Sequence, residues 1–251
     1  MKRYILIALA LLCLAGCAKQ FDINDIAVTP LQGPMETQYS AGSGTLEVED
    51  FIVLGRREYS IGNSKVSYSS KETIEGLHWN VTLQGLPRKL QVNLVIVTDK
   101  FGVPSSQLVI LSDKSAMISA NKNEETQLLV TDFFSSVFIP LTASQTGKGI
   151  AVSKRVPLQQ LKSDMLGSIT GEATITGQAT YDDTECYVLR YRAKSLPFKT
   201  ASRELVHAVI ESDLLLDKQT MTPVAGRSKM QFVAEDAKTN HATLISYVKK
   251  I

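Results

Sequence analysis

The feature that most constrains the fold is a strict alternation of apolar and polar side chains between residues 77 and 96. Apolar residues occupy every second position on both sides of the Gly85-Leu86-Pro87 break: Leu77, Trp79, Val81 and Leu83 before it, and Leu90, Val92, Leu94 and Ile96 after it. Successive side chains of a strand point to opposite faces, so this pattern predicts two half-buried strands. The short break between them predicts antiparallel neighbours.

The same period predicts strands in most of the remaining chain. Short apolar alternations at Leu46 and Val48, and at Val66 and Tyr68, predict two earlier strands. Later strands are expected over 173–181, 185–193, 204–216, 228–234 and 243–248. Asp182-Asp183 is typical of a turn, and residues 217–223 read as a hairpin-like connection.

Two segments in the middle of the chain follow a helical period instead. The first would begin near Asn123 and end before Pro140, with apolar residues on one face: Val130, Phe133, Phe134, Val137 and Phe138. The second would have Pro157 in its first turn and Gly167 as its stop, with Leu158, Leu161, Met165 and Leu166 on one face. The predicted fold class is therefore mainly β (α+β): a curved antiparallel sheet or incomplete β-barrel with two packed helices.

The phenylalanine-rich helix has two interpretations. An amphipathic helix on a sheet must bury its apolar face, so the simpler one is core packing. The other is a lid over an apolar cavity, in which Phe133, Phe134, Val137 and Phe138 line a ligand site.

The N-terminus has the organisation of an export signal. Lys2 and Arg3 precede an apolar run from Tyr4 to Ala15 that is too short to span a bilayer. Leu14-Ala15-Gly16-Cys17 then resembles the lipobox of bacterial lipoproteins. The resemblance implies cleavage between Gly16 and Cys17, acyl chains on Cys17 and membrane attachment through them. An ordinary secretory signal or a buried N-terminal helix is the alternative.

Residue 18 refines the expected location. It is Ala18 and not Asp, which by resemblance to enteric lipoproteins implies sorting to the outer membrane with the protein facing the periplasm; surface exposure is the alternative. The expected organisation is a signal peptide (1–16), a lipidated N-terminus with a flexible tether (17–44) and a β-rich periplasmic domain (45–251). A tether of that length would reach about 25–30 Å. Two sub-modules, 45–112 and 150–251, are the alternative to one domain.

Net charge and cysteine content limit the kinds of partner and the disulfide bonds that can be expected. The chain has 27 Lys and Arg against 25 Asp and Glu, and loss of Lys2 and Arg3 with the signal would make it neutral. Basic pairs are scattered along the sequence, so no nucleic-acid partner is expected. With Cys13 removed and Cys17 acylated, Cys186 would remain alone, as a buried structural thiol.

The sequence contains no complete catalytic motif. His78, His207 and His241 are far apart and form no His-Glu-x-x-His motif, so neither a metal nor another cofactor is expected. Ser119-x-x-Lys122 and Ser246-x-x-Lys249 lack the companion motifs of penicillin-binding enzymes. Turn and tether chemistry explains the carboxylate pairs Asp182-Asp183 and Asp22…Asp25. The sequence therefore predicts that the protein is not an enzyme.

A second resemblance concerns the C-terminal half. Long meandering strands, inserted apolar helices and the run Leu-Asp-Lys-x-Thr-x-x-Pro (Leu216 to Pro223) look like periplasmic carriers of the LolA/LolB and LppX type. The resemblance covers residues 150–234, while 45–112 departs from that plan. It implies an incomplete antiparallel barrel whose apolar concave face, covered by helices, holds acyl chains.

Two functions follow as expectations. The first is a non-catalytic carrier of a lipid or other apolar ligand. The alternative is a structural or interaction subunit of an envelope transport or secretion assembly, with a filled core and an exposed sheet edge or apolar patch that binds another envelope protein. A hydrolase ranks third.

Overall fold

The computed structural model describes residues 21–31, 38–86, 90–100, 104–112, 117–119, 150–157, 166–195, 197–199, 205–234 and 240–251. These residues form thirteen strands of one sheet and a single short 3₁₀ helix, η1 (Ile23–Asp25). The strands are β1 (Ser43–Leu54), β2 (Arg57–Thr73), β3 (Gly76–Leu86), β4 (Leu90–Thr98), β5 (Pro104–Ser112), β6 (Met117–Ser119), β7 (Ile150–Pro157), β8 (Leu166–Tyr181), β9 (Thr184–Ser195), β10 (Phe198–Lys199), β11 (Leu205–Asp217), β12 (Pro223–Ala234) and β13 (Asn240–Lys250).

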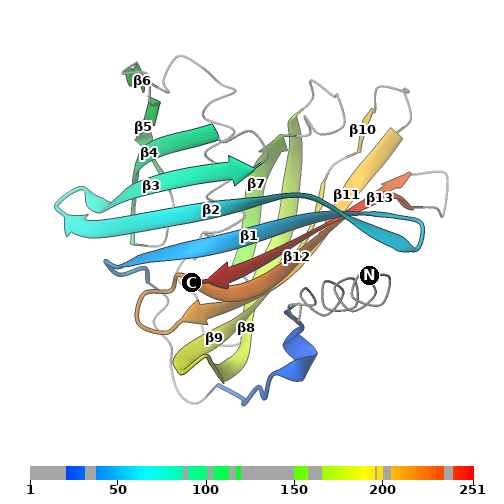
Figure 1. Cartoon of the computed structure of the whole chain (residues 1–251), viewed down its shortest axis with the longest axis horizontal. Coiled ribbons are helices and arrows are strands. Elements are labelled where there is room, and N and C mark those ends of the chain that lie inside the picture. Colours follow the sequence, from blue (N-terminus) through cyan, green and yellow to red (C-terminus); the bar gives the residue numbers. More distant parts are fainter. Residues whose placement is uncertain are drawn as a thin grey trace, which may run out of the picture.

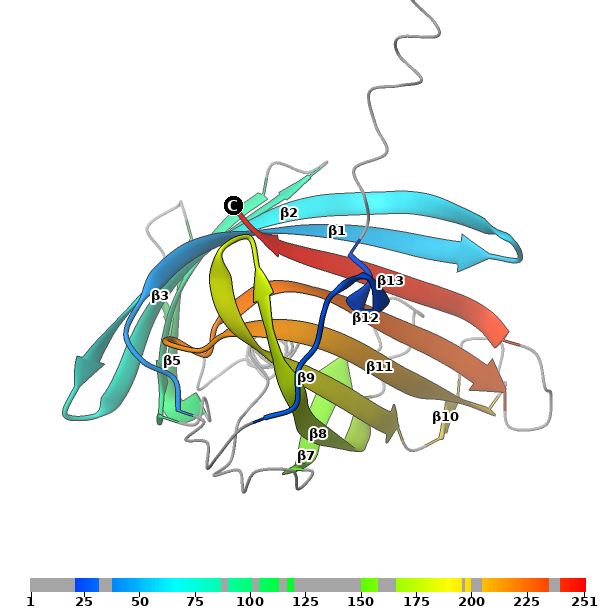
Figure 2. The ribbon, with the colours of Figure 1, turned by 90° about the horizontal axis from the view of Figure 1, so that it is seen from below.

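The sheet is antiparallel and strongly curved, as the alternation predicts. Its strand order is β6-β5-β4-β3-β2-β1-β13-β12-β11-β9-β8-β7, with β10 paired to β11 off this path. The last strand, β13, lies between β1 and β12 and so joins the first half of the chain to the second (Figure 1). Viewed from below, the sheet arches over an inner, concave side (Figure 2). Among the described strands no ladder joins β6 to β7, so the sheet is open.

The predicted antiparallel pairing of the strands on either side of Gly85-Leu86-Pro87 is confirmed. β3 and β4 pair antiparallel, with Leu83 opposite Val92 and Leu77 opposite Thr98. Trp79 is only 1% exposed, and its indole N–H donates to Thr98 Oγ1 at 2.9 Å. The Trp79 ring is therefore both packed and hydrogen-bonded, as a buried indole requires.

The Asp182-Asp183 turn is also confirmed. Both residues have positive φ angles, 45° and 60°, and connect β8 to β9 as a two-residue hairpin loop. Such loops favour positive φ because their twist then matches that of the strands, and Asp tolerates this conformation.

The predicted pair of packed helices is not supported, since the described residues contain no α-helix. The second helix is wrong at both ends: Pro157 ends β7, Leu166 begins β8, and the two residues pair across that hairpin. Gly167, the expected stop, is a strand residue opposite Val156. At Leu166 and Gly167, pairing with β7 overrides the local helical period, because strand formation depends on neighbouring strands more than on local sequence. Residues 120–149, with Asn123 and the phenylalanine-rich segment, and residues 158–165 lie outside the described part.

The first described residues pack on the domain, although 17–44 was expected to be a flexible tether. We call residues 21–31 the strap. Asp22 caps η1, and Thr29 and Gln178 exchange two backbone hydrogen bonds of 2.9 Å. Beyond the strap, Tyr39 is buried and lies edge-to-face with Trp79, their ring centroids 5.9 Å apart. The described parts of 17–44 therefore belong to the folded domain, which begins before residue 45.

The two faces of the sheet carry different apolar clusters. The inner cluster contains buried side chains from both halves of the chain: Tyr39, Leu46, Val66, Tyr68, Leu77, Trp79, Val81, Ile96, Ala173, Ile175, Leu189, Tyr191, Ala193, Ile210, Leu214, Leu216, Met221 and Val248. The outer cluster is smaller and consists of Ala179, Cys186, Val188, Leu215, Val224 and Ala225. Three strap residues, Phe21, Ile23 and Ile26, pack against the outer cluster, so the strap shields it from water.

Candidate functional site

A row of polar side chains crosses the inner face of four adjacent strands. Ser212 of β11, Ser228 of β12, Ser246 of β13 and Asp50 of β1 lie directly opposite one another in the register. The hydroxyl oxygens of Ser212 and Ser228 are 2.8 Å apart, and Ser246 Oγ donates to Asp50 Oδ1 at 2.6 Å. We call these four residues the polar row.

Asp50 is the one ionisable member of the polar row. Burial raises the pKa of its carboxyl group, and the hydrogen bond from Ser246 partly offsets that rise. Within the described residues, no cationic side chain forms an ion pair with Asp50. A half-buried carboxylate with a raised pKa and no cationic partner is a feature that binding sites often share.

Apolar side chains lie on both sides of the polar row. On one side is the inner cluster, in which side chains from both halves of the sheet meet and fill the space between them. On the other side is a second inner cluster of Val206, Ala208, Phe232 and Ala234, whose residues all come from β11 and β12. Both clusters are buried, the second with side chains at most 4% exposed, and Met230 packs against both of them.

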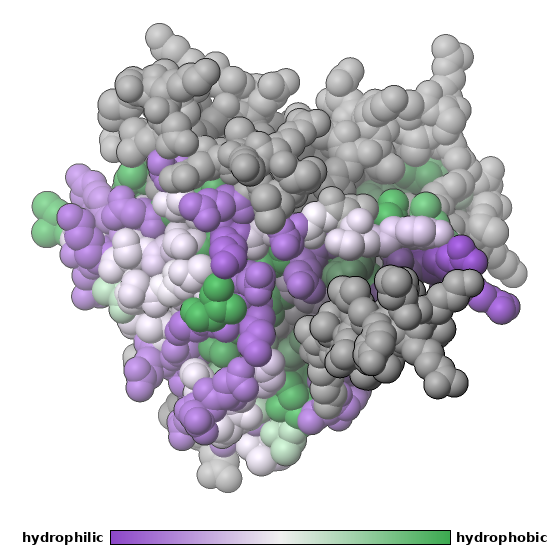
Figure 3. Space-filling model, viewed as in Figure 1, coloured by the Kyte–Doolittle hydropathy of each residue, from purple (hydrophilic) through white to green (hydrophobic). Residues whose placement is uncertain are grey.

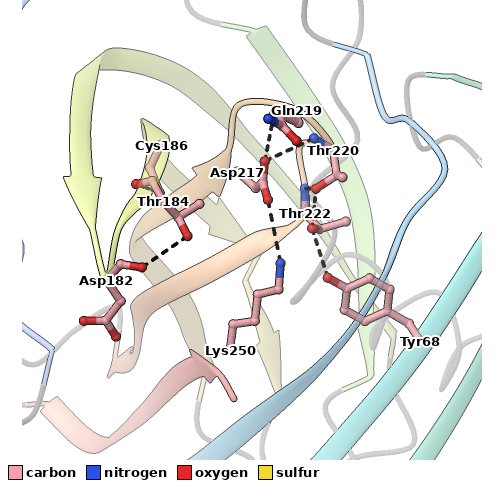
Figure 4. Close-up of polar contacts among 9 residues, drawn as sticks. All are labelled: Tyr68, Asp182, Thr184, Cys186, Asp217, Gln219, Thr220, Thr222 and Lys250. Carbon is pink, nitrogen blue, oxygen red and sulfur yellow. Dashed lines mark hydrogen bonds and ion pairs between the residues drawn. The ribbon is translucent and has the colours of Figure 1, made fainter.

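The Leu216–Pro223 connection, which carries the resemblance to periplasmic carriers, links β11 to β12. The Asp217 carboxylate accepts the Gln219 N–H at 2.7 Å and lies 3.7 Å from Lys250 Nζ (Figure 4). Lys218 Nζ donates to Gln178 at 2.9 Å and to Glu185 at 3.3 Å. Both charged residues of the motif therefore hold the turn against neighbouring strands.

The end of the same connection is buried against β2. Tyr68 OH donates to Thr222 Oγ1 at 3.0 Å, and the hydroxyl oxygens of Thr220 and Thr222 are 2.7 Å apart (Figure 4). Met221 has a φ of 60° and is 1% exposed. These contacts explain the motif by structure and require no ligand.

A hollow lies on the outer side of the sheet, next to the strap. It has a volume of about 690 Å³. Its lining combines carboxylates with aromatic rings: Phe21, Asp22, Asp25, Ile26, Ala27, Glu47, Glu49, Thr180, Tyr181, Asp182, Tyr247, Val248 and Lys249. We call it the acidic hollow. On the side seen in Figure 3, hydrophilic and intermediate residues are mixed, with small separate hydrophobic patches.

Several residues singled out in the sequence have structural roles. Cys186 is fully buried, and its thiol donates to the Thr184 carbonyl at 3.4 Å while burial raises its pKa to about 11. Ser246 is a strand residue, as expected, and Ser119 ends β6. His78, His207 and His241 belong to three different strands, β3, β11 and β13. Among the described residues, no group of His, Cys, Asp or Glu has an arrangement that could hold a metal ion.

Other predicted site residues lie outside the described part: Gly16, Cys17, Phe133, Phe134, Val137 and Phe138. The polar row was missed by sequence reasoning. Its signal is a polar residue at an inward position of each of four strands, and it becomes visible only when the strand pairing is known.

Comparisons with known proteins do not assign a family. No protein-family model matches the chain, and a search of curated proteins finds no match. In the described residues no helix is long and apolar enough to cross a membrane.

Proposed function

We propose that this chain is a non-catalytic lipoprotein, anchored in the outer membrane by acyl chains on Cys17 and facing the periplasm, that binds a lipid or other apolar ligand. The observation that carries the ligand proposal is the inner face of an open, curved sheet, apolar on both sides of the polar row. The lipobox-like Leu14–Cys17 run supports the anchor.

The ligand would lie against the second inner cluster. The buried side chains of this cluster come from β11 and β12 alone, whereas the inner cluster draws on both halves of the sheet. Binding there would need no reaction, because each methylene moved from water into apolar surroundings contributes about 0.8 kcal/mol. The polar row would then lie beside the polar group of an amphiphilic ligand.

Anchoring can be tested separately from ligand binding. The mature protein should begin at Cys17, carry acyl chains and fractionate with outer membranes. Cys17→Ala should release the protein from the membrane or stall its processing. An unmodified mature N-terminus at another residue would refute the anchor.

Ligand binding can be tested with a matched pair of variants on β11. Ala208 faces the second inner cluster, whereas Val209 points to the opposite face of the same strand. Ala208→Met should lower the amount of lipid that copurifies with folded protein, because it fills space beside the cluster; Val209→Met should not. Equal lipid content in the two variants and the wild type would argue against this location.

A second candidate, an interaction subunit of an envelope transport or secretion assembly, is favoured by the open sheet. In the described part of the chain, β6 and β7 each have a single strand neighbour. Strand edges and exposed apolar side chains such as Leu54 and Ile74 are common protein-binding features. Recovery of a stoichiometric, ligand-free complex with another envelope protein would favour this function over the carrier.

A further inference from the structure

The strap leaves very little chain between the proposed lipid anchor and the folded domain. Phe21 packs on the outer cluster and lies edge-to-face with Tyr181, with ring centroids 6.2 Å apart. Four residue steps separate Cys17 from Phe21, and an extended chain spans at most about 14 Å over four residues. A tether of 25–30 Å is therefore replaced by a link about half as long.

That short link restricts how the domain meets the membrane. The polar layer of one leaflet is roughly 5–8 Å thick, and acyl chains on Cys17 would hold the start of the link within it. Phe21 must then stay close to the headgroups, together with the surface around it. That surface is the acidic hollow, since Phe21, Asp22 and Asp25 are part of its lining.

The charge of the acidic hollow selects the headgroup chemistry. Its lining contains five carboxylates and one lysine: Asp22, Asp25, Glu47, Glu49 and Asp182 against Lys249. Five carboxylates against one lysine give the lining residues a formal charge of −4. Two cations next to the lining partly offset this charge: Arg227, whose Cζ lies 5.9 Å from the centre of the Tyr247 ring, and Lys65, which is opposite Glu47 in the register. Phe21, Tyr181 and Tyr247 add aromatic rings, which suit both the membrane interface and ammonium groups.

We propose that the acidic hollow and the adjoining strap form a membrane-docking surface for headgroups that carry an ammonium group. The domain lies against the bilayer with this face towards the lipid, where the carboxylates attract ammonium groups and repel anionic headgroups. This orientation rests on the proposed anchor at Cys17. It places the β2–β3 turn, at the far end of the sheet from the strap, away from the membrane (Figure 2).

The orientation can be measured with the full acylated protein in vesicles of phosphatidylethanolamine and phosphatidylcholine. A fluorophore is attached to Ala27→Cys in the acidic hollow or to Ile74→Cys in the β2–β3 turn; both positions are exposed. Nitroxide groups on the lipid headgroups should quench the label at residue 27 several-fold more than the label at residue 74. Equal quenching, or stronger quenching at residue 74, would overturn the proposed surface.

Two controls separate the possible failures. Mass measurement of the same preparation establishes whether Cys17 is acylated: without acylation the anchor itself fails, and with acylation equal quenching refutes only the orientation. Replacing phosphatidylethanolamine by phosphatidylglycerol should reduce quenching at residue 27, and Glu47→Gln with Glu49→Gln should restore part of it. Quenching that does not depend on headgroup charge would refute the ammonium preference.

Discussion

Gly177→Ala should detach the strap from the sheet while leaving the sheet itself intact. Gly177 lies beside the backbone hydrogen bonds that join Thr29 to Gln178. A methyl group on Gly177 would lie 2.7 Å from the Thr29 carbonyl oxygen and 2.6 Å from a Val28 methyl carbon. Both separations are too short, and because the oxygen belongs to the backbone, the strap must move.

The expected cost follows from what the strap loses. Each of the two Thr29–Gln178 hydrogen bonds contributes about 0.5–1.5 kcal/mol net, so their loss should lower the free energy of unfolding by about 1–3 kcal/mol. If the strap instead stayed in place, crowding would cost about 1–3 kcal/mol as well. Stability alone therefore does not distinguish the two responses, and a local measurement is required.

Hydrogen exchange at individual amides supplies that measurement. In the wild type the Thr29 and Gln178 amides should be protected, and in Gly177→Ala both should exchange much faster, while amides of β9 and β11 keep their protection. Thr176→Ala, an exposed neighbour on the same strand, is the matched control and should leave both amides protected. Unchanged exchange at Thr29 in Gly177→Ala, with an unfolding free energy within about 0.5 kcal/mol of wild type, would refute the reasoning.

Three further predictions concern the interior. Trp79→Ala should lower the free energy of unfolding in urea by about 3–5 kcal/mol, whereas Ile74→Ala, fully exposed, should change it by less than about 0.5 kcal/mol. With a pKa of about 11, the Cys186 thiol should be about one part in a thousand ionised at pH 8, so it should react with maleimide only after denaturation. The pKa of Asp50 is raised on folding, so its contribution to stability should fall as pH rises from its unfolded pKa of 3.8 through its folded pKa. Asp50→Asn should remove that part of the pH dependence. Urea titrations of both proteins at pH 4 and pH 7 would measure the difference.

The strands were predictable from the sequence because inward-facing apolar residues recur at every second position, the period of a strand. Leu77, Trp79 and Val81 alternate without interruption, and all three are buried. Asp182-Asp183 likewise carries its turn chemistry locally. The sequence does not show which strands pair with each other. β13 lies between β1 and β12, and its pairing with β1, for example of Val248 with Val48, is not encoded by any local pattern.

The strap was missed for a related reason. Six of its eleven residues are apolar but follow no regular strand or helix period, and its attachment depends on Gly177, 148 positions after Thr29, being small enough to let it approach. A regular alternation over 173–181 would place Gly177 on the same face as Ile175, but β8 has a register shift between these two residues that reverses the face of the following ones. The polar row was missed because its residues come from four strands that only the fold aligns.

The most direct test of the proposed carrier is native mass spectrometry of the whole protein purified from cell envelopes in mild detergent. The proposal predicts a chain that begins at Cys17, with the added mass of its acyl chains, and a lipid or other apolar ligand that stays bound without a covalent link. Ala208→Met should reduce the bound fraction in the same spectrum. An acylated but ligand-free protein in a fixed ratio with another envelope protein would contradict the carrier.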